Sequence, residues 1–235
     1  MSIQGNLAEP RPRTLRLDAT FPKLVVSAPA RVIPQAVPVA RPWVKRALDL
    51  FLAIPALILL SPVMLGIAIL IVLDSRGPVF FRQTRTGLNG RPFSIFKFRS
   101  MSVLENGDHI MQARQNDPRV TRIGRVLRRT SLDELPQLLN VISGEMSLVG
   151  PRPHAQAHDR LYATLIGNYP QRQLAKPGIT GWAQVHGLRG ETPTVESMKA
   201  RVDFDLWYVR NASFVLDVEI LFRTVFEIFR RTNAY

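Results

Sequence analysis

The sequence predicts a mainly α-helical membrane protein of the monotopic type, which enters the bilayer from one side, with one small β-hairpin. Three observations lead to this prediction. No charged residue stands between Leu50 and Leu73, two β-prone runs flank a glycine-rich turn at residues 87–90, and apolar residues recur at helical spacing later in the chain. We expect a re-entrant helix near the N-terminus and interfacial amphipathic helices around one larger domain.

The composition limits the partners and the chemistry. The 235 residues carry a formal net charge of +13, which indicates an anionic partner such as nucleic acid, anionic lipid or a phosphorylated substrate. Only a membrane also explains the apolar run, so we expect anionic membrane lipid and no nucleic acid. The chain has no cysteine, which excludes disulfides and thiolate zinc sites. The oligomeric state is not predicted.

Residues 1–42 are predicted to form a disordered, basic, proline-rich arm. They hold seven prolines and show neither helical nor strand periodicity. They also lack the apolar run of a signal peptide. Two interpretations stay open, a tail without a function of its own and a basic arm that rests on an anionic membrane.

Residues 43–76 are predicted to form a re-entrant membrane helix. The 24 uncharged positions would extend about 36 Å as a helix, enough to cross a hydrocarbon core of about 30 Å. However, Ser61-Pro62 in the middle predicts a kink, and both flanks are basic, which favours the cytoplasmic side for both. We therefore prefer a helix that dips into one leaflet and returns over a spanning helix or a buried soluble one. The Ser61 hydroxyl is expected to satisfy the backbone that the proline leaves open.

Residues 77–235 are predicted to form a domain at the cytoplasmic face of the membrane. Its hairpin pairs residues 79–84 with 92–99, and Phe93 and Ile95 are expected to pack on the membrane helix. Ile123, Val126 and Leu127 have helical spacing, and a second apolar helix is expected from Ser131 until Gly144 stops it. Another helix is expected from about residue 154 to 166, whereas Lys176–Trp182 is expected to be a loop. The amphipathic C-terminal segment could lie in the membrane interface or pack on the core.

Asp133-Glu134 is the strongest candidate for chemistry. One alternative is structural, because Ser131 could cap a helix and Glu134 could close the capping box. The other is functional, because Arg128 and Arg152 stand nearby in the sequence. Guanidinium groups bind phosphoryl oxygens, one carboxylate can hold Mg²⁺ beside a substrate phosphate, and the other can act as a nucleophile.

Four blocks of the sequence closely resemble the bacterial sugar transferase family, the monotopic phosphoglycosyl transferases that prime surface polysaccharide synthesis. The blocks are Lys97–Met101, Ser131–Leu138, Met146–Pro153 and Pro177–Trp182. The resemblance extends from about Val44 to about Phe222.

The resemblance implies a reaction and a role for each matching residue. Asp133 matches the nucleophile that expels UMP from a UDP-sugar, and Glu134 matches the neighbouring Mg²⁺ ligand. The covalent phosphosugar is then taken by undecaprenyl phosphate at the cytoplasmic face of the bacterial inner membrane. The residues that match substrate-binding positions are Lys97, Arg99, Arg128, Pro151, Arg152 and Pro153. Ser61 and Pro62 match the kink of the family's re-entrant helix.

The resemblance is less specific for the sugar. Residues 154–158 and 187–192 are similar to hexose-type members, which implies a UDP-hexose donor, either glucose or galactose. An N-acetylated sugar is the alternative. A basic membrane scaffold without catalytic activity is the alternative of a different class, and it predicts that Asp133→Asn leaves function intact.

Overall fold

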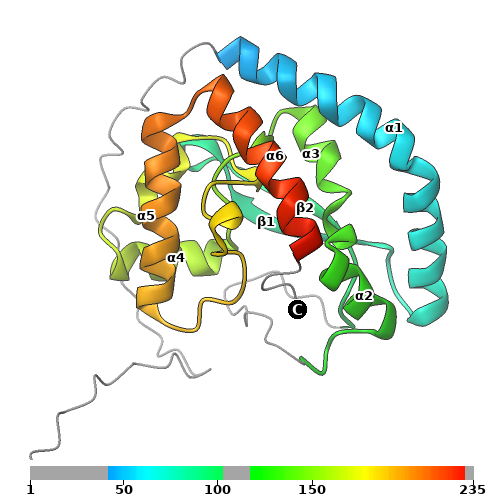
Figure 1. Ribbon diagram of the computed structural model, residues 1–235. Helices are drawn as coiled ribbons and strands as arrows, with labels where there is room; N and C mark the ends of the chain where they lie inside the picture. The colour runs from blue at the N-terminus through cyan, green and yellow to red at the C-terminus, as the bar shows by residue number, and fades with distance from the viewer. Residues whose placement is uncertain (1–41, 103–116, 231–235) are drawn as a thin grey trace, which may run out of the picture.

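The computed structural model describes residues 42–102 and 117–230, except for the side chains of residues 228–230. The predicted arm therefore lies outside the described residues, apart from Pro42. One long helix, α1 (Pro42–Asp74), bends around one side of the domain (Figure 1). Its inner face buries Ala53, Ile67 and Ile71, whereas large apolar side chains cover its outer face. By length and composition α1 could cross a membrane.

The middle of α1 has the local chemistry that the sequence predicts. Pro62 has no N–H to donate to the carbonyl oxygen of Ile58, four residues earlier. The Ser61 hydroxyl donates to that oxygen at 2.7 Å. This expected compensation is confirmed, and it lets the helix continue through Pro62.

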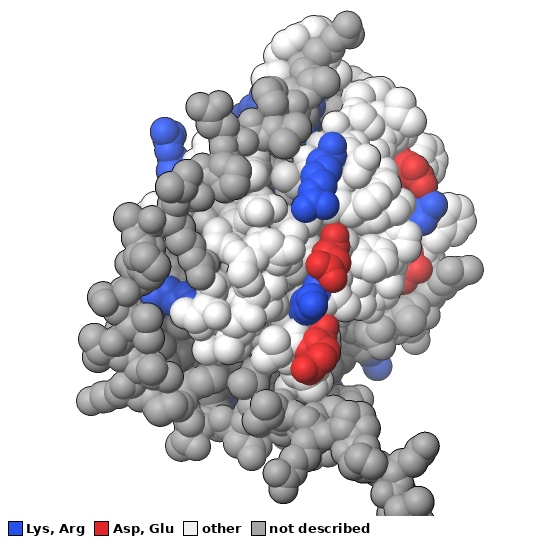
Figure 2. Space-filling model, turned by 90° about the vertical axis from the view of Figure 1, so that its left-hand side faces the viewer, with Lys and Arg blue, Asp and Glu red and all other residues white. Residues whose placement is uncertain are grey.

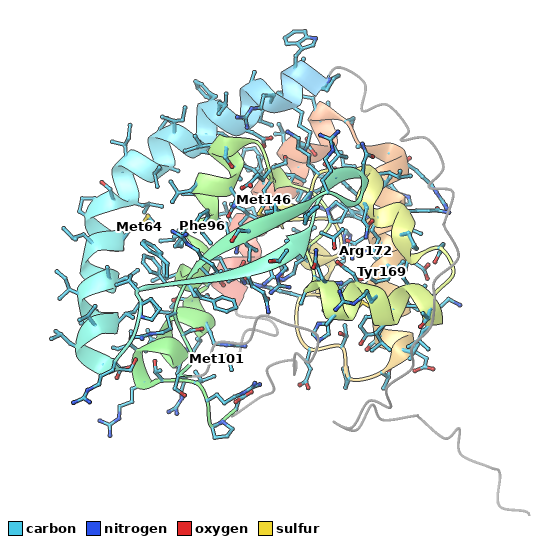
Figure 3. The ribbon with its side chains drawn as sticks, turned by 180° about the vertical axis from the view of Figure 1, so that it is seen from behind. Met64, Phe96, Met101, Met146, Tyr169 and Arg172 are labelled. Carbon is cyan, nitrogen blue, oxygen red and sulfur yellow. The ribbon has the colours of Figure 1, made fainter. Side chains whose placement is uncertain are left out.

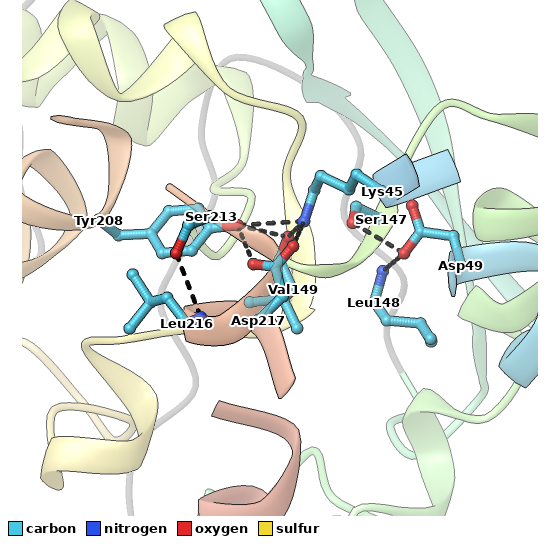
Figure 4. Close-up of polar contacts among 9 residues, drawn as sticks. All are labelled: Lys45, Asp49, Ser147, Leu148, Val149, Tyr208, Ser213, Leu216 and Asp217. Carbon is cyan, nitrogen blue, oxygen red and sulfur yellow. Dashed lines mark hydrogen bonds and ion pairs between the residues drawn. The ribbon is translucent and has the colours of Figure 1, made fainter. Parts of the chain in front are cut away.

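The start of α1 is fastened to the domain by a polar group that Figure 4 shows in close-up. The Lys45 ammonium lies 2.7 Å from the Asp217 carboxylate and donates to the Tyr208 hydroxyl at 3.1 Å. It also donates to the carbonyl oxygen of Val149 at 2.9 Å. Because Asp217 and Tyr208 are buried, this cation is held in a largely dry environment.

Two more side chains near the start of α1 reach neighbouring elements. Asp49 accepts hydrogen bonds of 2.9 Å from the Ser147 hydroxyl and from the Leu148 amide. Arg46 donates to two carbonyl groups in the last turn of α3 (Gln137–Ser143). The Val141 carbonyl also accepts from the Gly144 amide at 3.0 Å, so Arg46 adds a second cap at the C-terminal end of α3.

The end of α1 is attached to the same domain. Arg99 donates to the carbonyl groups of Ile71, Ser75 and Arg76 at 3.2, 2.5 and 2.6 Å. The Asp74 carboxylate accepts from the Ile123 amide in the first turn of α2 (Arg122–Thr130) at 3.1 Å. Both ends of α1 therefore lie against one domain.

The predicted hairpin is present. Strands β1 (Phe80–Thr86) and β2 (Pro92–Phe98) pair antiparallel around a short 3-10 turn, η1 (Leu88–Gly90). Phe93 and Ile95 pack against Ala53 of α1, which confirms the expected contact. Behind the hairpin, Met146 completes this part of the core (Figure 3).

A tight turn joins the two helices that follow. Helix α2 (Arg122–Thr130) ends at Ser131, whose φ of 61° is left-handed, and the chain then forms the 3-10 turn η2 (Leu132–Glu134). The Ser131 side chain makes no capping hydrogen bond with η2. The capping-box alternative is therefore wrong. Helix α3 follows, and Gly144, with a φ of 85°, ends it as predicted.

A second small sheet was not expected. Residues 178–180, expected to be loop, form strand β4 (Gly178–Thr180), which pairs in parallel with β3 (Ser147–Val149). The backbones approach closely just beyond this pair, because a Cβ on Gly178 would lie 2.1 Å from the Gly150 nitrogen. A strand of three residues is too short to show an alternating pattern, which is why the prediction was wrong.

The last part of the chain forms helices that cover the site. They are α4 (Gln156–Leu165), the 3-10 turns η3 (Tyr169–Leu174) and η4 (Gln184–His186), α5 (Val195–Asn211) and α6 (Phe214–Arg230). The amphipathic helix α6 buries Leu216 and Ile220 in the core and exposes Phe222, Val225 and Phe226. It therefore packs on the core and still presents an apolar outer face.

Candidate active site

The two carboxylates predicted to do chemistry lie together inside the domain. Asp133 and Glu134 belong to η2, and each is only 8% exposed. The left-handed turn at Ser131 reverses the chain after α2 and directs both residues inward. Lys97 extends from β2, and Arg152 comes from the loop after β3 to meet them.

Glu134 is paired with two cations. Its carboxylate accepts from the Lys97 ammonium at 2.9 Å and from both terminal nitrogens of Arg152, one of them at 3.1 Å. Burial alone would raise the pKa of Glu134, but Arg152 and Lys97 outweigh burial and hold that pKa well below its ordinary value. Glu134 is therefore ionised across the physiological range.

The surroundings shift the pKa of Asp133 in the opposite direction. No described residue donates a hydrogen bond to its carboxylate, and burial raises its pKa to about 6, although Lys97 and Arg128 oppose the rise. Adjacent carboxylates with separated pKa values are typical of sites that assign them separate tasks. A buried, ionised and poorly solvated carboxylate is suited to attack an electrophile.

Cations surround this pair in excess. Lys97, Arg128, Arg152 and Arg189 all act electrostatically on Asp133 or Glu134. Burial lowers the pKa of Lys97 and of Arg189, although the charges of Glu134 and Asp133 oppose the fall. Burial, assisted by the charge of Arg152, lowers the pKa of Arg85 to about 10. Such a site favours an incoming polyanion such as a diphosphate.

The loop Pro151–Arg152–Pro153 also borders an open pocket of about 260 Å³. Three residues give this pocket a polar wall. His154 and Arg172 are buried, and the Asp159 carboxylate accepts from the Tyr169 hydroxyl at 2.6 Å. Burial and the Arg172 charge hold the pKa of His154 well below its ordinary value, so its ring is neutral. The remaining lining residues are Thr86, Gly87, Gln173, Ala175 and Pro177.

The structure brings together most of the predicted site. Lys97, Asp133, Glu134 and Arg152 are in contact or close to one another, with Arg128 beside them and Pro151 and Pro153 framing the Arg152 loop.

Arg99 does not belong to this group. Its side chain is 2% exposed and caps the end of α1, so the predicted substrate-binding role is wrong. Sequence reasoning missed Arg85 and Arg172. Arg85 alternates with other polar residues in an edge strand, and Arg172 stands in a polar segment, so neither shows a local signal.

The donor set agrees with a magnesium ion that is held together with a substrate. No group of three or more potential metal ligands occurs within residues 42–102 and 117–230. Mg²⁺, however, commonly takes one or two carboxylates plus substrate phosphates. The Glu134 carboxylate accepts three hydrogen bonds, and an ionised carboxylate has about four lone-pair sites, so it could still offer one oxygen.

Known proteins match most of this chain. A family model described as bacterial sugar transferase matches residues 40–231. The UDP-glucose:undecaprenyl-phosphate glucose-1-phosphate transferase of Escherichia coli (strain K12) is 56% identical over 191 residues, which cover 81% of this chain and 41% of that protein. Proteins of the same name from Klebsiella pneumoniae and Caulobacter vibrioides are 52% and 51% identical, again over 81% of this chain, and over 41% and 72% of their own length. The chain thus spans about two fifths of the length of the first two relatives. Since the family model covers nearly the whole described chain, this chain belongs to the bacterial sugar transferase family.

Proposed function

We propose that this protein transfers glucose-1-phosphate from UDP-glucose to undecaprenyl phosphate and releases UMP. The observation that carries the proposal is the arrangement around Asp133. Its carboxylate is buried and receives no hydrogen bond from the described residues, while cations in excess surround it. This arrangement suits a nucleophile that meets a diphosphate. The product would be the first lipid-linked intermediate of an exopolysaccharide, capsule or O-antigen.

The reaction takes two displacements at one phosphorus atom. An oxygen of Asp133 attacks the phosphorus that carries the sugar, the bond from this phosphorus to the bridging oxygen breaks, and UMP leaves with that oxygen. A phosphate oxygen of undecaprenyl phosphate then attacks the same phosphorus and releases the Asp133 carboxylate. Arg152, Arg128 and Lys97 stabilise the negative charge on the transferring group.

A magnesium ion would bind at Glu134 together with the diphosphate oxygens. When bound, the ion would neutralise charge on the transferring phosphoryl group. Glu134 would still hold Arg152 and Lys97 in place, since one carboxylate can serve several cations.

Glucose is the favoured sugar because the most similar relatives reported above are named for UDP-glucose. UDP-galactose and UDP-N-acetylated sugars are the alternatives. The neutral His154 ring in the pocket wall presents a donor and an acceptor of the kind that sugar hydroxyls need, and it does not by itself distinguish epimers.

The membrane would receive α1 from the cytoplasmic side only. A spanning helix would place its two ends on opposite faces of the bilayer. Here Lys45 fastens the start of α1 and Arg99 caps its end, both within one domain, which supports a helix that enters and returns. The exposed apolar side chains of α1 and of α6 would face lipid.

The charge distribution on the α5 side does not favour nucleic acid. Figure 2 shows acidic and basic side chains alternating along a column there. The exposed charged residues of α5 are Glu196, Lys199, Asp203 and Arg210, which sum to zero. A nucleic-acid surface needs a face of one sign. Anionic lipid remains the proposed partner for the basic remainder of the chain.

The nucleotide that is released tests the proposal. Detergent-solubilised protein is incubated with Mg²⁺, undecaprenyl phosphate and a panel of UDP-sugars, and the nucleotides are separated. UMP with UDP-glucose supports the proposal, whereas UMP with another sugar changes the donor. UDP would mean transfer without the phosphate and would overturn the role of Asp133. Omitting the lipid and using donor labelled on the sugar phosphate should leave label on the wild-type chain and none on Asp133→Asn.

A topology experiment tests the membrane part separately. Pro62→Leu restores the backbone donor and removes the cause of the bend, so the variant should favour a spanning helix. A tag at residue 1 should then become accessible from the periplasm. If the tag stays cytoplasmic in Pro62→Leu, the bend does not determine the topology.

A further inference from the structure

The loop that carries Arg152 is held through its carbonyl oxygens. The Lys45 ammonium donates to the Val149 oxygen at 2.9 Å, and the Gly178 amide donates to the Pro151 oxygen at 3.0 Å. Arg172 donates to the Arg152 oxygen at 2.7 Å. At the next residue of the loop, Arg85 donates to the Pro153 carbonyl oxygen at 3.3 Å.

The sequence of the loop explains why side chains donate to its carbonyl oxygens. Pro151 and Pro153 have no N–H, so the loop lacks two of the donors that would tie it to a neighbouring strand. Carbonyl groups remain as the points of attachment. A buried carbonyl group requires a hydrogen-bond donor, and here the cationic side chains of Lys45, Arg85 and Arg172 provide three such donors.

The Arg172 side chain is buried, and hydrogen bonds from three of its atoms fix its position. Only 5% of it is exposed, and its planar guanidinium uses three different nitrogens. The Nε atom donates to Asp205 at 2.8 Å, one terminal nitrogen donates to the Tyr169 hydroxyl at 3.2 Å, and the other donates to the Arg152 oxygen. Figure 3 shows Tyr169 and Arg172 side by side next to α4. Since Asp205 belongs to α5, the guanidinium connects the Arg152 loop to α5.

We propose that Arg172 is a positioning residue, which sets the backbone of Arg152 so that the Arg152 guanidinium meets Glu134 and the transferring phosphate. This inference rests on the proposed function, because Arg152 is assigned there to the phosphoryl group. Arg172 itself touches neither carboxylate of η2. Its influence passes through the hydrogen bond to the Arg152 carbonyl.

The test uses a change that keeps the charge. Arg172→Lys retains a cation for Asp205, but a single ammonium at the end of a flexible chain cannot reproduce the planar fork. A displacement of about 1 Å at a reacting group can lower a rate by about 100-fold. We expect Arg172→Lys to lower kcat/KM by about that factor. Arg210→Lys, on the exposed side of α5, is the matched control and should retain wild-type activity.

A double-mutant cycle separates positioning from general weakening. Arg152→Lys should lower activity by itself, because an ammonium cannot reproduce the paired contact with Glu134. If Arg172 acts only through Arg152, then Arg172→Lys in the Arg152→Lys background should cause little further loss. Losses that multiply would overturn the proposal, as would wild-type kcat/KM in Arg172→Lys alone.

Hydrogen exchange provides a readout that does not depend on activity. Peptides that cover residues 149–156 should exchange faster in Arg172→Lys than in the wild type, whereas peptides from β1 and β2 should not change. Unchanged exchange in 149–156 would refute the positioning role. Absence of UMP release by the wild type would instead refute the proposed function, and the exchange comparison would still decide on Arg172.

Discussion

The Lys45 ammonium, near the start of α1, lies 2.9 Å from the carbonyl oxygen of Val149, which stands two residues before Pro151. The same nitrogen pairs with Asp217 of α6 at 2.7 Å. One side chain thus joins α1, α6 and the strand that leads to the Arg152 loop. The position of the active site relative to α1 depends on this contact.

Lys45→Met should destabilise the protein more than an ordinary loss of a surface charge. The change leaves Asp217, 3% exposed at its side chain, as a buried carboxylate without its cation. Removing one partner of a buried pair typically costs about 3–5 kcal/mol. Denaturant unfolding in detergent measures the difference. Lys199→Met on α5 serves as control, and Lys45→Met with Asp217→Asn should recover part of the loss; equal effects of the two lysine changes would contradict this account.

Asp133→Asn should abolish transfer and stabilise the fold at the same time. The folded carboxyl has a pKa of about 6, above the unfolded value of about 3.9, so the native state binds more protons between these values and loses stability as the pH rises through them. Asparagine carries no such penalty, which amounts to about 2–3 kcal/mol above pH 6. Thermal unfolding at pH 8 and pH 4 should show a gain that is present at pH 8 and lost at pH 4. A variant that is less stable at pH 8 would contradict the assigned pKa.

The pH dependence of kcat/KM should have an acid limb near pH 6. The proposed nucleophile must be ionised, so activity should fall as the pH drops below the pKa of Asp133 in the free enzyme. Arg128 lowers that pKa, and Arg128→Gln should therefore move the limb to higher pH. A limb that stays in place in Arg128→Gln would mean that another group controls it.

Glu134→Gln should weaken activity and metal dependence together. The amide keeps the shape but loses the negative charge that pairs with Arg152 and Lys97 and that would hold Mg²⁺. We expect a loss of about 100-fold in kcat and a higher Mg²⁺ concentration for half-maximal rate. Chelation should stop the wild-type reaction, and added Mg²⁺ should restore it. An unchanged metal requirement in Glu134→Gln would assign the metal to other ligands.

Local patterns predicted the elements whose side chains repeat over several turns or strands. The hairpin, the apolar helix and the stop at Gly144 all follow from such patterns, and so does the Ser61 hydrogen bond across Pro62. Strands β3 and β4 were not predicted, because a strand of three residues is too short to show an alternating pattern. Their pairing depends on the close approach of two backbones at Gly150 and Gly178.

The site residues were predictable where charged residues lie close together in the sequence, and they were not predictable where segments distant in the sequence come together. Asp133 and Glu134 are adjacent, and their arginine neighbours are close in sequence. Arg172, in contrast, finds Asp205 33 positions later, a relation that no local pattern contains. Arg99 shows the reverse error, because its block resembles the family while its guanidinium is used to end a helix.

Because α1 is attached to the domain at both ends, the helix and the domain form one unit. A domain joined to a membrane helix by a flexible linker could take many orientations relative to the bilayer, whereas a domain attached to α1 at both ends would keep its active site at a fixed depth. Under the proposed function, the UDP-sugar would arrive by three-dimensional diffusion in water, whereas the polyprenyl phosphate would arrive by lateral diffusion within one leaflet. The effective concentration of this lipid acceptor would be its mole fraction in that leaflet, so adding inert lipid should slow the reaction even when the total amount of acceptor is unchanged.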